Sequence, residues 1–481
     1  MYTSLVLYLP SLLNLARCMS NFREEELLNQ LMPHQREAVA FLADMKTCGS
    51  LLAWQAGCGK TLPVLLSLFK RNTFPALIVA PAPLLGVWVD ELKKWFGQEP
   101  ILLRGTPKVR EELYKNFPTE RRLQIFIVSY ETLRIDFEKF INKIEWQAIV
   151  LDESGKIRSP RALVTKKILK LKAPLKIAMD GNPISNGIAD LWAVSEFLEP
   201  NILYGSFWTF RNKHARMNPY IRGKIDGWLD RDFILEKVAH LVSWKKKKDV
   251  LKDLPPVVEQ EIRFDLNSVE RDLYNKIKRE ILIEMDGEET SITNALTRLL
   301  RLRQCVNGTI SFMPDAYHST KVDTLLELVG TLPEESKIII FTSFLDTAED
   351  VERRLSAEKG IKCVKITGST PTEEREKAVR KFQESPFVRV MVGTDAMSRG
   401  LNLQAAEYVV NVDLPWSYAT YDQRIGRAWR QGQKKPVTVY NLIANKTVDE
   451  HVQKILARKI GEAEEACVTM EDVMNILAEP F

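Results

Sequence analysis

The sequence predicts an α/β protein with two parallel-sheet lobes and a helical insertion between them. From about residue 49 to residue 179, short apolar runs alternate with stretches of helical periodicity, and the same alternation returns after residue 321. Short apolar runs of this kind are typical of strands buried on both faces, and strands that alternate with helices form parallel sheets. Residues from about 200 to 320 show long helical patterns instead, which predicts an insertion that also links the lobes.

The expected elements follow in chain order. In the first lobe we expect strands at 50–54, 76–80, 124–129, 148–151 and 176–179, with helices at 63–70 and 87–96. In the second lobe we expect strands at 337–341, 362–366, 388–393, 408–413 and 437–441, and a helical end at 448–477. The predicted organisation is an N-terminal tail (1–30), a first lobe (31–200), an insertion and linker (201–320), a second lobe (321–450) and C-terminal helices (451–481).

The composition is that of an ordinary globular protein. A prior of about 100–200 residues per domain gives roughly three domains for 481 residues. Hydrophobic residues make up 45% and charged residues 27%, which excludes collagen-like, coiled-coil and wholly disordered chains. The net charge of +5 permits a basic groove for nucleic acid but does not require one. Six scattered cysteines without a C-x-x-C pair indicate a reducing, intracellular compartment.

The first residues do not form a recognisable targeting segment. Residues 5–16 are mostly apolar, but Pro10 interrupts them and no basic residue precedes them. A signal peptide needs a positive start, and a membrane helix needs about 18 or more apolar residues. We therefore expect a soluble protein. Its first residues are either a docking or disordered tail, or the result of a start codon assigned upstream of the true start at Met19.

The segment from Trp54 to Thr61 follows a predicted strand and opens a predicted helix, which is the context of a P-loop. Gly57 and Gly59 would let backbone N–H groups close on phosphate oxygens. Lys60 would reach the β- and γ-phosphates, and the Thr61 hydroxyl would bind Mg²⁺. Trp54 replaces the first glycine of the usual pattern, so the alternative is an ordinary glycine turn before a helix.

An apolar strand ending in two carboxylates supplies the second half of the predicted nucleotide site. Asp152 would hold Mg²⁺, and Glu153 would polarise the attacking water. The alternative is a solvated acidic pair that starts a loop. We favour the catalytic interpretation because a P-loop precedes the pair in the same α/β layer.

Two arginines in the second lobe are candidates for the transition-state charge. Arg427 and Arg430 are three residues apart, which predicts that they share one face of a helix. Reaching the γ-phosphate from a facing lobe, such arginines accelerate phosphoryl transfer by about 10³–10⁵. The alternative is a basic surface helix, and only the P-loop elsewhere in the chain favours the catalytic interpretation.

Together these residues resemble the Swi/Snf-type ATPases of helicase superfamily two, and in particular compact phage or bacterial members. The resemblance runs from about residue 31 to about residue 451, and its motifs stand in the family's order. Further matches lie at 31–35 (adenine motif), 81–88 (motif Ia), 129–131 (Ib), 181–186 (III), 341–344 (IV), 393–403 (V) and 423–433 (VI). The resemblance implies two RecA-like lobes, ATP and Mg²⁺ as cofactors, and DNA as a partner.

The resemblance also implies further site residues. Four of them would contact the nucleotide: Gln35, Gly400, Asn402 and Gln423. Four hydroxyl side chains would face DNA phosphates: Ser129, Thr342, Thr367 and Thr394. Phosphate contacts carry no sequence information, so we expect a duplex or branched DNA partner, no sequence specificity and a strong salt dependence.

The chain departs from the family pattern at two places. Gly155 stands where the family has the histidine of D-E-x-H, and Asp180 stands at the first position of motif III. That histidine is thought to couple hydrolysis to motif III, so the departures concern the coupling step and not hydrolysis.

Three functional hypotheses remain. The leading one is an ATP-driven translocase on duplex DNA, acting in replication, recombination or repair. A conventional strand-separating DNA or RNA helicase is favoured by motif V, which contains Thr394 and Asp395. A degenerate motor that binds DNA without coupled turnover is motivated by Gly155 and Asp180.

Two basic clusters have alternative interpretations. The four lysines at 245–248 are either a DNA-binding patch or a solvated hinge between the lobes. Arg298, Arg301 and Arg303 lie at helical spacing. They either contact DNA or only solvate a helix, and we favour the second interpretation.

Overall fold

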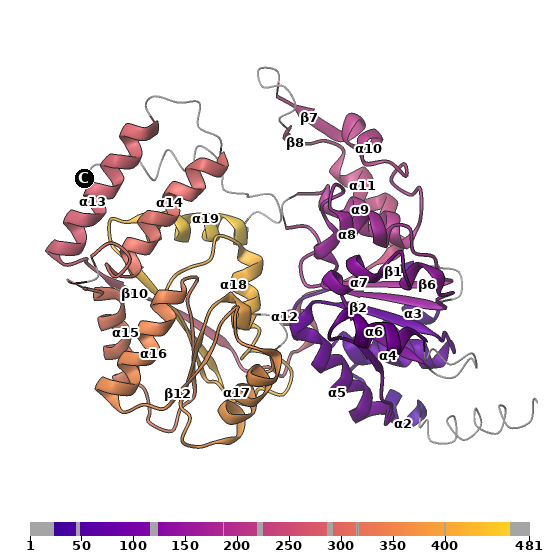
Figure 1. The fold of residues 1–481 in the computed structure, drawn as a ribbon, viewed down its shortest axis with the longest axis horizontal. Coiled ribbons are helices and arrows are strands. Elements are labelled where there is room, and N and C mark those ends of the chain that lie inside the picture. The colour runs from indigo at the N-terminus through magenta and orange to yellow at the C-terminus, as the bar shows by residue number, and fades with distance from the viewer. Residues whose placement is uncertain are drawn as a thin grey trace, which may run out of the picture. The chain divides into compact units, whose positions relative to one another are not determined.

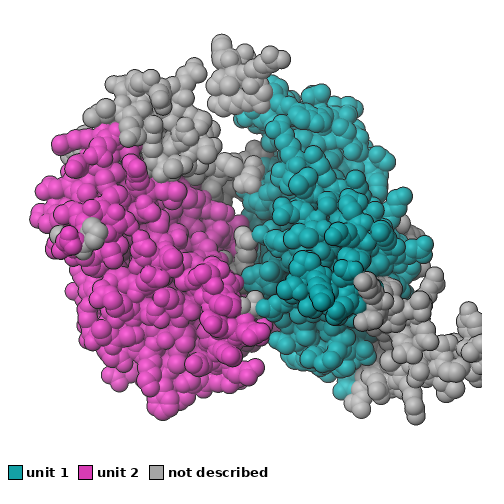
Figure 2. All heavy atoms as spheres, in the orientation of Figure 1, with its two compact units in different colours: residues 1–250 teal, residues 251–481 magenta. Residues whose placement is uncertain are grey.

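The computed structural model describes residues 24–44, 49–115, 124–185, 187–218, 225–285, 292–313, 315, 317–398 and 401–461. The chain divides into two compact units, residues 1–250 and residues 251–481 (Figure 2). Each unit contains one parallel β-sheet with helices on both faces, so the predicted fold class is confirmed (Figure 1).

The sheet of the first unit has seven strands in the order β3-β4-β2-β5-β6-β1-β9, and every neighbouring pair is parallel. Its strands are β1 (Gly49–Trp54), β2 (Ala76–Ala80), β3 (Ile101–Leu103), β4 (Ile125–Ser129), β5 (Ala148–Asp152), β6 (Leu175–Asp180) and β9 (Val242–Lys245). A separate antiparallel hairpin is formed by β7 (Ala215–Met217) and β8 (Ile225–Trp228). The short helical turns are η1 (Ala82–Leu84), η2 (Ile141–Lys143), η3 (Ser154–Ile157) and η4 (Ala239–Leu241).

The helices of this unit are α2 (Glu24–Gln30), α3 (Pro33–Ala43), α4 (Thr61–Lys70), α5 (Leu85–Phe96), α6 (Pro107–Lys115), α7 (Tyr130–Asp136), α8 (Leu163–Ile168), α9 (Asp190–Leu198), α10 (Phe207–His214), α11 (Arg231–Val238) and α12 (Lys247–Val250). Alternate residues of the central strands enter two different cores. Leu51 and Ala53 of β1 pack with α7, α8 and α9, whereas Leu52 and Trp54 pack with α3, α4 and α5. Successive side chains of a strand point to opposite faces of the sheet, and helices cover both faces here, so these strands are apolar on both faces.

The second unit has a six-stranded parallel sheet in the order β10-β15-β14-β11-β13-β12. Its strands are β10 (Val257–Phe264), β11 (Ile338–Phe341), β12 (Cys363–Ile366), β13 (Val390–Gly393), β14 (Tyr408–Asn411) and β15 (Val437–Ala444). Its helices are α13 (Ser268–Met285), α14 (Ile292–Asn307), α15 (Thr320–Thr331), α16 (Leu345–Lys359), α17 (Thr372–Glu384), η6 (Asp395–Ser398), α18 (Tyr418–Ile425) and α19 (Val448–Gly461). Ile338 and Ile340 pack with α15 and α16, whereas Ile339 and Phe341 pack with α13, α14, α18 and α19.

The ten strands expected from apolar runs are confirmed, with ends shifted by at most three residues. The predicted insertion (201–320) also contains four strands, β7 to β10. β9 and β10 each lie at the edge of a parallel sheet, and the boundary between the units passes between these two strands. The expected C-terminal helix is confirmed over 448–461, and the rest of it lies outside the described residues, as does the start of the predicted tail. Within the described part of the chain, no helix is both long and apolar enough to cross a membrane.

Candidate nucleotide-binding site

The loop between β1 and α4 has the strand, turn and helix that a phosphate-binding loop requires. Gly57 and Gly59 have φ angles of 89° and 72°, a left-handed backbone that glycine adopts without steric cost. No side chain caps the first turn of α4, so the N–H groups at Thr61 and beyond can donate to an anion. The Lys60 ammonium donates to the Trp54 carbonyl oxygen at 2.7 Å. The predicted context of the motif is therefore confirmed, and the ligand roles of its residues stay predictions.

Two side chains of α3 hold this loop in place. Gln35 donates from Nε2 to the carbonyl oxygen of Gly59 at 2.9 Å, and its Oε1 accepts from the N–H of Met32 at 3.0 Å. His34 Nε2 lies 3.0 Å from the carbonyl oxygen of Cys58. Burial lowers the pKa of His34, so its ring is neutral near pH 7 and Nε2 is the donor. Gln35 thus lies against the predicted P-loop, and its contact with adenine stays a prediction.

The predicted carboxylate pair stands at the end of β5. Asp152 Oδ2 accepts from the indole N–H of Trp88 at 2.9 Å, and Oδ1 accepts from the N–H of Glu153 at 3.0 Å. Burial raises the pKa of Asp152, against the opposing effects of the Trp88 N–H and of the Lys60 ammonium. The fold therefore brings Lys60 close enough to Asp152 to influence its charge. The next residue, Glu153, has left-handed backbone angles, φ 51° and ψ 55°.

Sequence reasoning missed two aromatic contacts at this carboxylate. Trp88 falls within the predicted motif Ia, but its sequence position gave no sign that its indole would reach Asp152. Tyr130 donates its hydroxyl to the backbone oxygen of Asp152 at 2.8 Å, and burial raises the pKa of this phenol well above its ordinary value. Two donors thus hold the carboxylate and a third holds the backbone oxygen of the same residue.

Two of the lysines at 245–248, Lys245 and Lys247, lie against the predicted P-loop. The N–H of Gln55 donates to the Lys245 carbonyl oxygen at 3.1 Å, and the N–H of Lys247 donates to Gln55 Oε1 at 2.8 Å. Lys245 pairs with Glu37 at 2.6 Å, and Lys247 is 1% exposed. The burial of Lys247 contradicts both interpretations for that residue, and for the other three lysines both stay predictions. The parallel pairing of β9 with β1 is the physical reason, because it places residues 245–247 beside the loop that follows β1.

The prediction that Arg427 and Arg430 share one face of a helix is wrong. The helix α18 ends at Ile425, and the following residues form turns. Two N–H groups, of Ala428 and Trp429, donate to the same carbonyl oxygen of Ile425 at 3.1 and 2.9 Å. Glycine is a poor helix former, and Gly426 comes directly after the last helical residue.

The predicted nucleotide contacts of the second unit lie around this turn. Arg427 is 7% exposed and donates to the carbonyl oxygens of Gln423 and Leu401, each at 3.1 Å. Asn402, next to Leu401, is exposed and donates from Nδ2 to Gln404 at 3.3 Å. Arg430 is half-buried, and Gly400 lies outside the described residues. The structure thus brings Asn402, Gln423 and Arg427 together, and their roles stay predictions.

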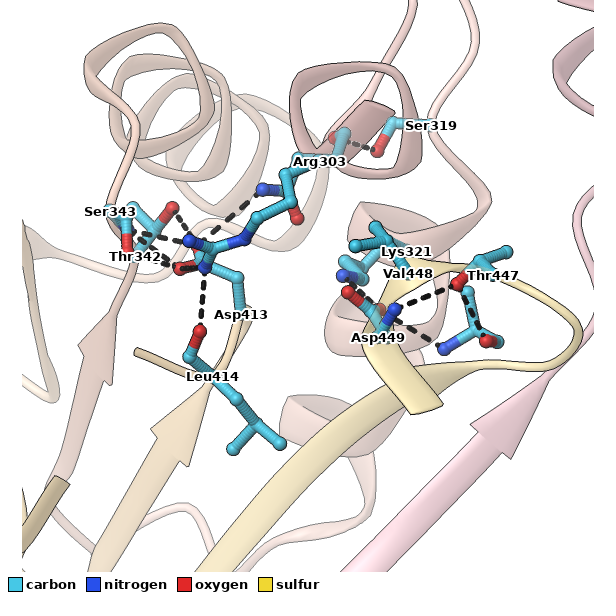
Figure 3. Close-up of polar contacts among 12 residues, drawn as sticks. Arg303, Ser319, Lys321, Thr342, Ser343, Asp413, Leu414, Thr447, Val448 and Asp449 are labelled. Carbon is cyan, nitrogen blue, oxygen red and sulfur yellow. Dashed lines mark hydrogen bonds and ion pairs between the residues drawn. The ribbon is translucent and has the colours of Figure 1, made fainter. Parts of the chain in front are cut away.

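A buried carboxylate that the sequence did not single out organises the same unit (Figure 3). Asp413, 1% exposed, accepts from the Thr342 hydroxyl at 2.6 Å and from the N–H of Ser343 at 2.9 Å. Arg303 donates to it at 3.1 Å. Burial alone would raise the pKa of Asp413, but Arg303, Arg424 and the hydroxyls outweigh it and hold the pKa below its ordinary value. Neither predicted interpretation fits Arg303, which is 3% exposed and belongs to this network.

A second ion pair in this view is also buried. Lys321 on α15 pairs with Asp449 on α19 at 2.6 Å, and neither side chain is more than 5% exposed (Figure 3). Arg424, at the end of α18, pairs with Asp395 at 2.7 Å and donates to the Asp413 carbonyl oxygen at 2.7 Å. Buried charges are retained only when paired, and the contacts of the buried Arg424 with Asp395 and with the Ser343 hydroxyl connect the segments that carry motifs IV, V and VI.

The four hydroxyl side chains proposed to face DNA are largely engaged within the protein. Ser129 caps α7 by accepting an N–H of its first turn at 3.1 Å. Thr342 is buried and bonded to Asp413, and Thr367 is 4% exposed. Thr394 is half-buried. A phosphate contact by Thr342 would need its bond to Asp413 to open, and all four DNA contacts stay predictions.

The fold and the loop after β1 define a P-loop protein with two RecA-like units. The chain belongs to the SNF2 family: the model of the SNF2-related domain matches residues 34–309, and that of the helicase conserved C-terminal domain matches residues 320–432. The family that the motifs suggested is therefore confirmed.

Relatives occur in bacteria and eukaryotes. An uncharacterized ATP-dependent helicase of Mycoplasma pneumoniae is 30% identical over 447 residues, which cover 91% of this chain and 42% of the relative. The Zorya protein ZorD of Escherichia coli is 31% identical over 465 residues, covering 85% of this chain and 42% of ZorD. The chain thus spans about two fifths of the length of these relatives. The Sulfolobus solfataricus SWI2/SNF2 ATPase core in complex with dsDNA is 25% identical, with a TM-score of 0.43, over 94% of this chain and 97% of that one.

Proposed function

We propose that this protein is a DNA-dependent ATPase that couples ATP hydrolysis to movement along duplex DNA. The observation that carries the proposal is the P-loop beside a half-buried carboxylate pair, in a chain that belongs to the SNF2 family. Relatives that are ATP-dependent helicases, and an SNF2 core bound to double-stranded DNA, support the choice of ATP and DNA as ligands.

The residues of the first unit fit a nucleoside triphosphate with Mg²⁺. The glycine turns, the uncapped start of α4 and the Lys60 ammonium supply donors and positive charge for phosphate oxygens. The Thr61 hydroxyl and the Asp152 carboxylate are oxygen ligands of the kind Mg²⁺ prefers. A bound Mg²⁺ would offset phosphate charge, and it would also lower the raised pKa of Asp152.

The chain's own residues would then position the reaction. Glu153 follows Asp152 directly and would orient the water that attacks the γ-phosphate, accepting its proton. Trp88 and Tyr130 hold Asp152 and its peptide group in place, which reduces the reorganisation needed at the moment of reaction. Arg427 and Arg430 of the second unit would neutralise charge that develops in the transition state.

DNA would be bound through its backbone. The proposed contacts are hydroxyl and amide groups, which read phosphates and not base edges, so affinity would fall steeply with salt and vary little with sequence. A strand-separating helicase and a motor without coupled turnover are the alternatives. A specific observation favours the motor without coupled turnover, because Gly155 has no side chain with which to couple the D-E-x-H segment to motif III.

Steady-state ATP hydrolysis tests this proposal, measured without nucleic acid and with duplex, single-stranded, forked and four-way DNA and RNA. We expect duplex DNA to stimulate turnover at least as well as single strands. Lys60→Ala and Glu153→Gln should abolish the stimulated turnover, whereas Lys70→Ala, an exposed lysine at the other end of α4, should not change it. Turnover that survives in Lys60→Ala would contradict the site, and stimulation by RNA alone would contradict the DNA partner.

A further inference from the structure

The space above Gly155 is filled by an arginine of the same turn. A Cβ atom at position 155 would lie 2.4 Å from Arg158 Nη2 and 3.0 Å from Asp180 Oδ2. Arg158 also donates from Nε to the carbonyl oxygen of Gly155 at 2.9 Å. The guanidinium of Arg158 thus fills the space that a side chain at position 155 would need.

Asp180 ties the carboxylate segment to the segment after β6. Its Oδ2 accepts from the N–H of Gly155 at 2.5 Å, and its Oδ1 accepts from the N–H of Asn182 at 2.8 Å. The side chain is 5% exposed, so water competes little for these bonds. The pairing of β5 with β6, which brings Asp152 opposite Met179, places the two strand ends side by side. A carboxylate at position 180 is therefore explained by its two backbone donors.

A second connection runs through Arg158. Its Nη1 lies 3.8 Å from Asp190 Oδ2, and the same oxygen accepts from the N–H of Ser185 at 3.0 Å. Asp190 is the first residue of α9, where a negative charge is favoured by the helix dipole. Residues 182 and 185 are thus each held by a carboxylate that also contacts the turn after Glu153.

We infer that Arg158, Asp180 and Asp190 are positioning residues that transmit the state of the nucleotide site at Glu153 to residues 181–185. The inference rests on the proposed function, since it names how this chain would couple hydrolysis without a side chain at position 155. Two observations favour a movable connection over a rigid brace. Glu153 holds left-handed backbone angles that a non-glycine residue adopts at a cost. The Arg158–Asp190 pair is long, and its arginine is 34% exposed, so the pair is easily broken.

Hydrogen exchange tests the inference in the full chain, without and with Mg²⁺ and a non-hydrolysable ATP analogue. In wild type, binding of the analogue should change exchange in peptides that cover β6 and residues 181–185. In Arg158→Ala and Asp180→Asn, the affinity for the analogue should stay within about threefold of wild type. The exchange response should fall to less than about a fifth. Arg161→Ala, an exposed arginine three residues further on, is the matched control and should keep the full response.

The outcomes separate this inference from the proposed function. Absence of analogue binding in wild type would overturn the proposed function, and the inference with it. Binding with no response at 181–185 in wild type, or with an undiminished response in both variants, would overturn the inference alone. Loss of the response in Arg161→Ala would overturn it too, because it would indicate a general loss of structure.

A double-mutant cycle gives a second measure of the same contact. Gly155→Ala places a methyl group against the Arg158 guanidinium, so it should weaken the exchange response as Arg158→Ala does. When Arg158 is already alanine, adding Gly155→Ala should have a smaller effect than in wild type, because the contact at 2.4 Å is gone and only that with Asp180 Oδ2 at 3.0 Å remains. Additive effects of the two substitutions would contradict the relay through Arg158.

Discussion

Arg303→Ala offers a quantitative test of the network around Asp413. The substitution removes an ion pair of 3.1 Å and a bond of 2.6 Å to the Leu414 carbonyl oxygen, and it leaves a carboxylate that is 1% exposed. Removing one partner of a buried ion pair costs about 3–5 kcal/mol. Because Thr342 and Ser343 still donate to Asp413, we expect the lower end, about 3 kcal/mol, in the free energy of unfolding of the second unit.

The assay is hydrogen exchange of β11 and β14 across a urea series, which reports the unfolding of the second unit separately. Arg301→Ala is the control, because Arg301 lies on the same helix but is exposed, and it should change the free energy by less than about 0.5 kcal/mol. A loss in Arg303→Ala no larger than that of Arg301→Ala would refute the reasoning.

The Arg303–Asp413 ion pair also predicts how the free energy of unfolding depends on pH. The folded-state pKa of Asp413 lies below its ordinary value, so its contribution to stability is present above the unfolded pKa of about 3.9. It is lost as the pH falls through the folded pKa. Without Arg303 the folded-state pKa of Asp413 should be higher, so the difference between wild type and Arg303→Ala should shrink on acidification, as Asp413 is protonated first in the variant and then in wild type. A difference that grows on acidification would contradict the assigned direction.

Three predictions concern the nucleotide site. Arg430→Ala should lower kcat by about 10³-fold, and the Kd for ATP should change less than about threefold. Arg380→Ala, at an exposed arginine, is the control. A loss of ATP affinity at unchanged kcat would contradict the role of Arg430 in the transition state. Trp88→Phe removes the N–H donor of Asp152, so the acid limb of the Mg²⁺-dependent kcat/KM profile should move to higher pH, and an unmoved limb would contradict the assignment. Glu153→Gln should reduce kcat by about 10²–10⁴ while analogue binding persists.

The central strands could be predicted because burial on both faces leaves an uninterrupted apolar run. Five strands were missed: β3, β9 and β10 each lie at the edge of a parallel sheet, and β7 and β8 form the separate hairpin. An edge strand has one open side, and every residue of β10 is exposed or half-buried, so the segment shows no uninterrupted apolar run. Long-range pairing, and not local pattern, makes these segments strands.

The nucleotide site was predictable to the extent that it is local in sequence. The P-loop and the carboxylate pair each occupy a few consecutive residues with a fixed physical task. Asp413 carries no such pattern, and its partner Arg303 lies 110 residues away along the chain, so only the fold shows that the arginine is structural. The end of α18 before Arg427 was missed for a related reason, because the turn residues that follow Gly426 are compatible with helical spacing.

ATP-dependent displacement of a third strand from a triplex tests coupled movement on duplex DNA most directly. The wild-type protein should displace the third strand only with Mg²⁺ and ATP, and Glu153→Gln should not displace it. Neither protein should unwind a plain blunt duplex. Vigorous DNA-stimulated hydrolysis without displacement would contradict coupled translocation, and robust unwinding of a simple tailed duplex would contradict the duplex-tracking mechanism in favour of a conventional helicase.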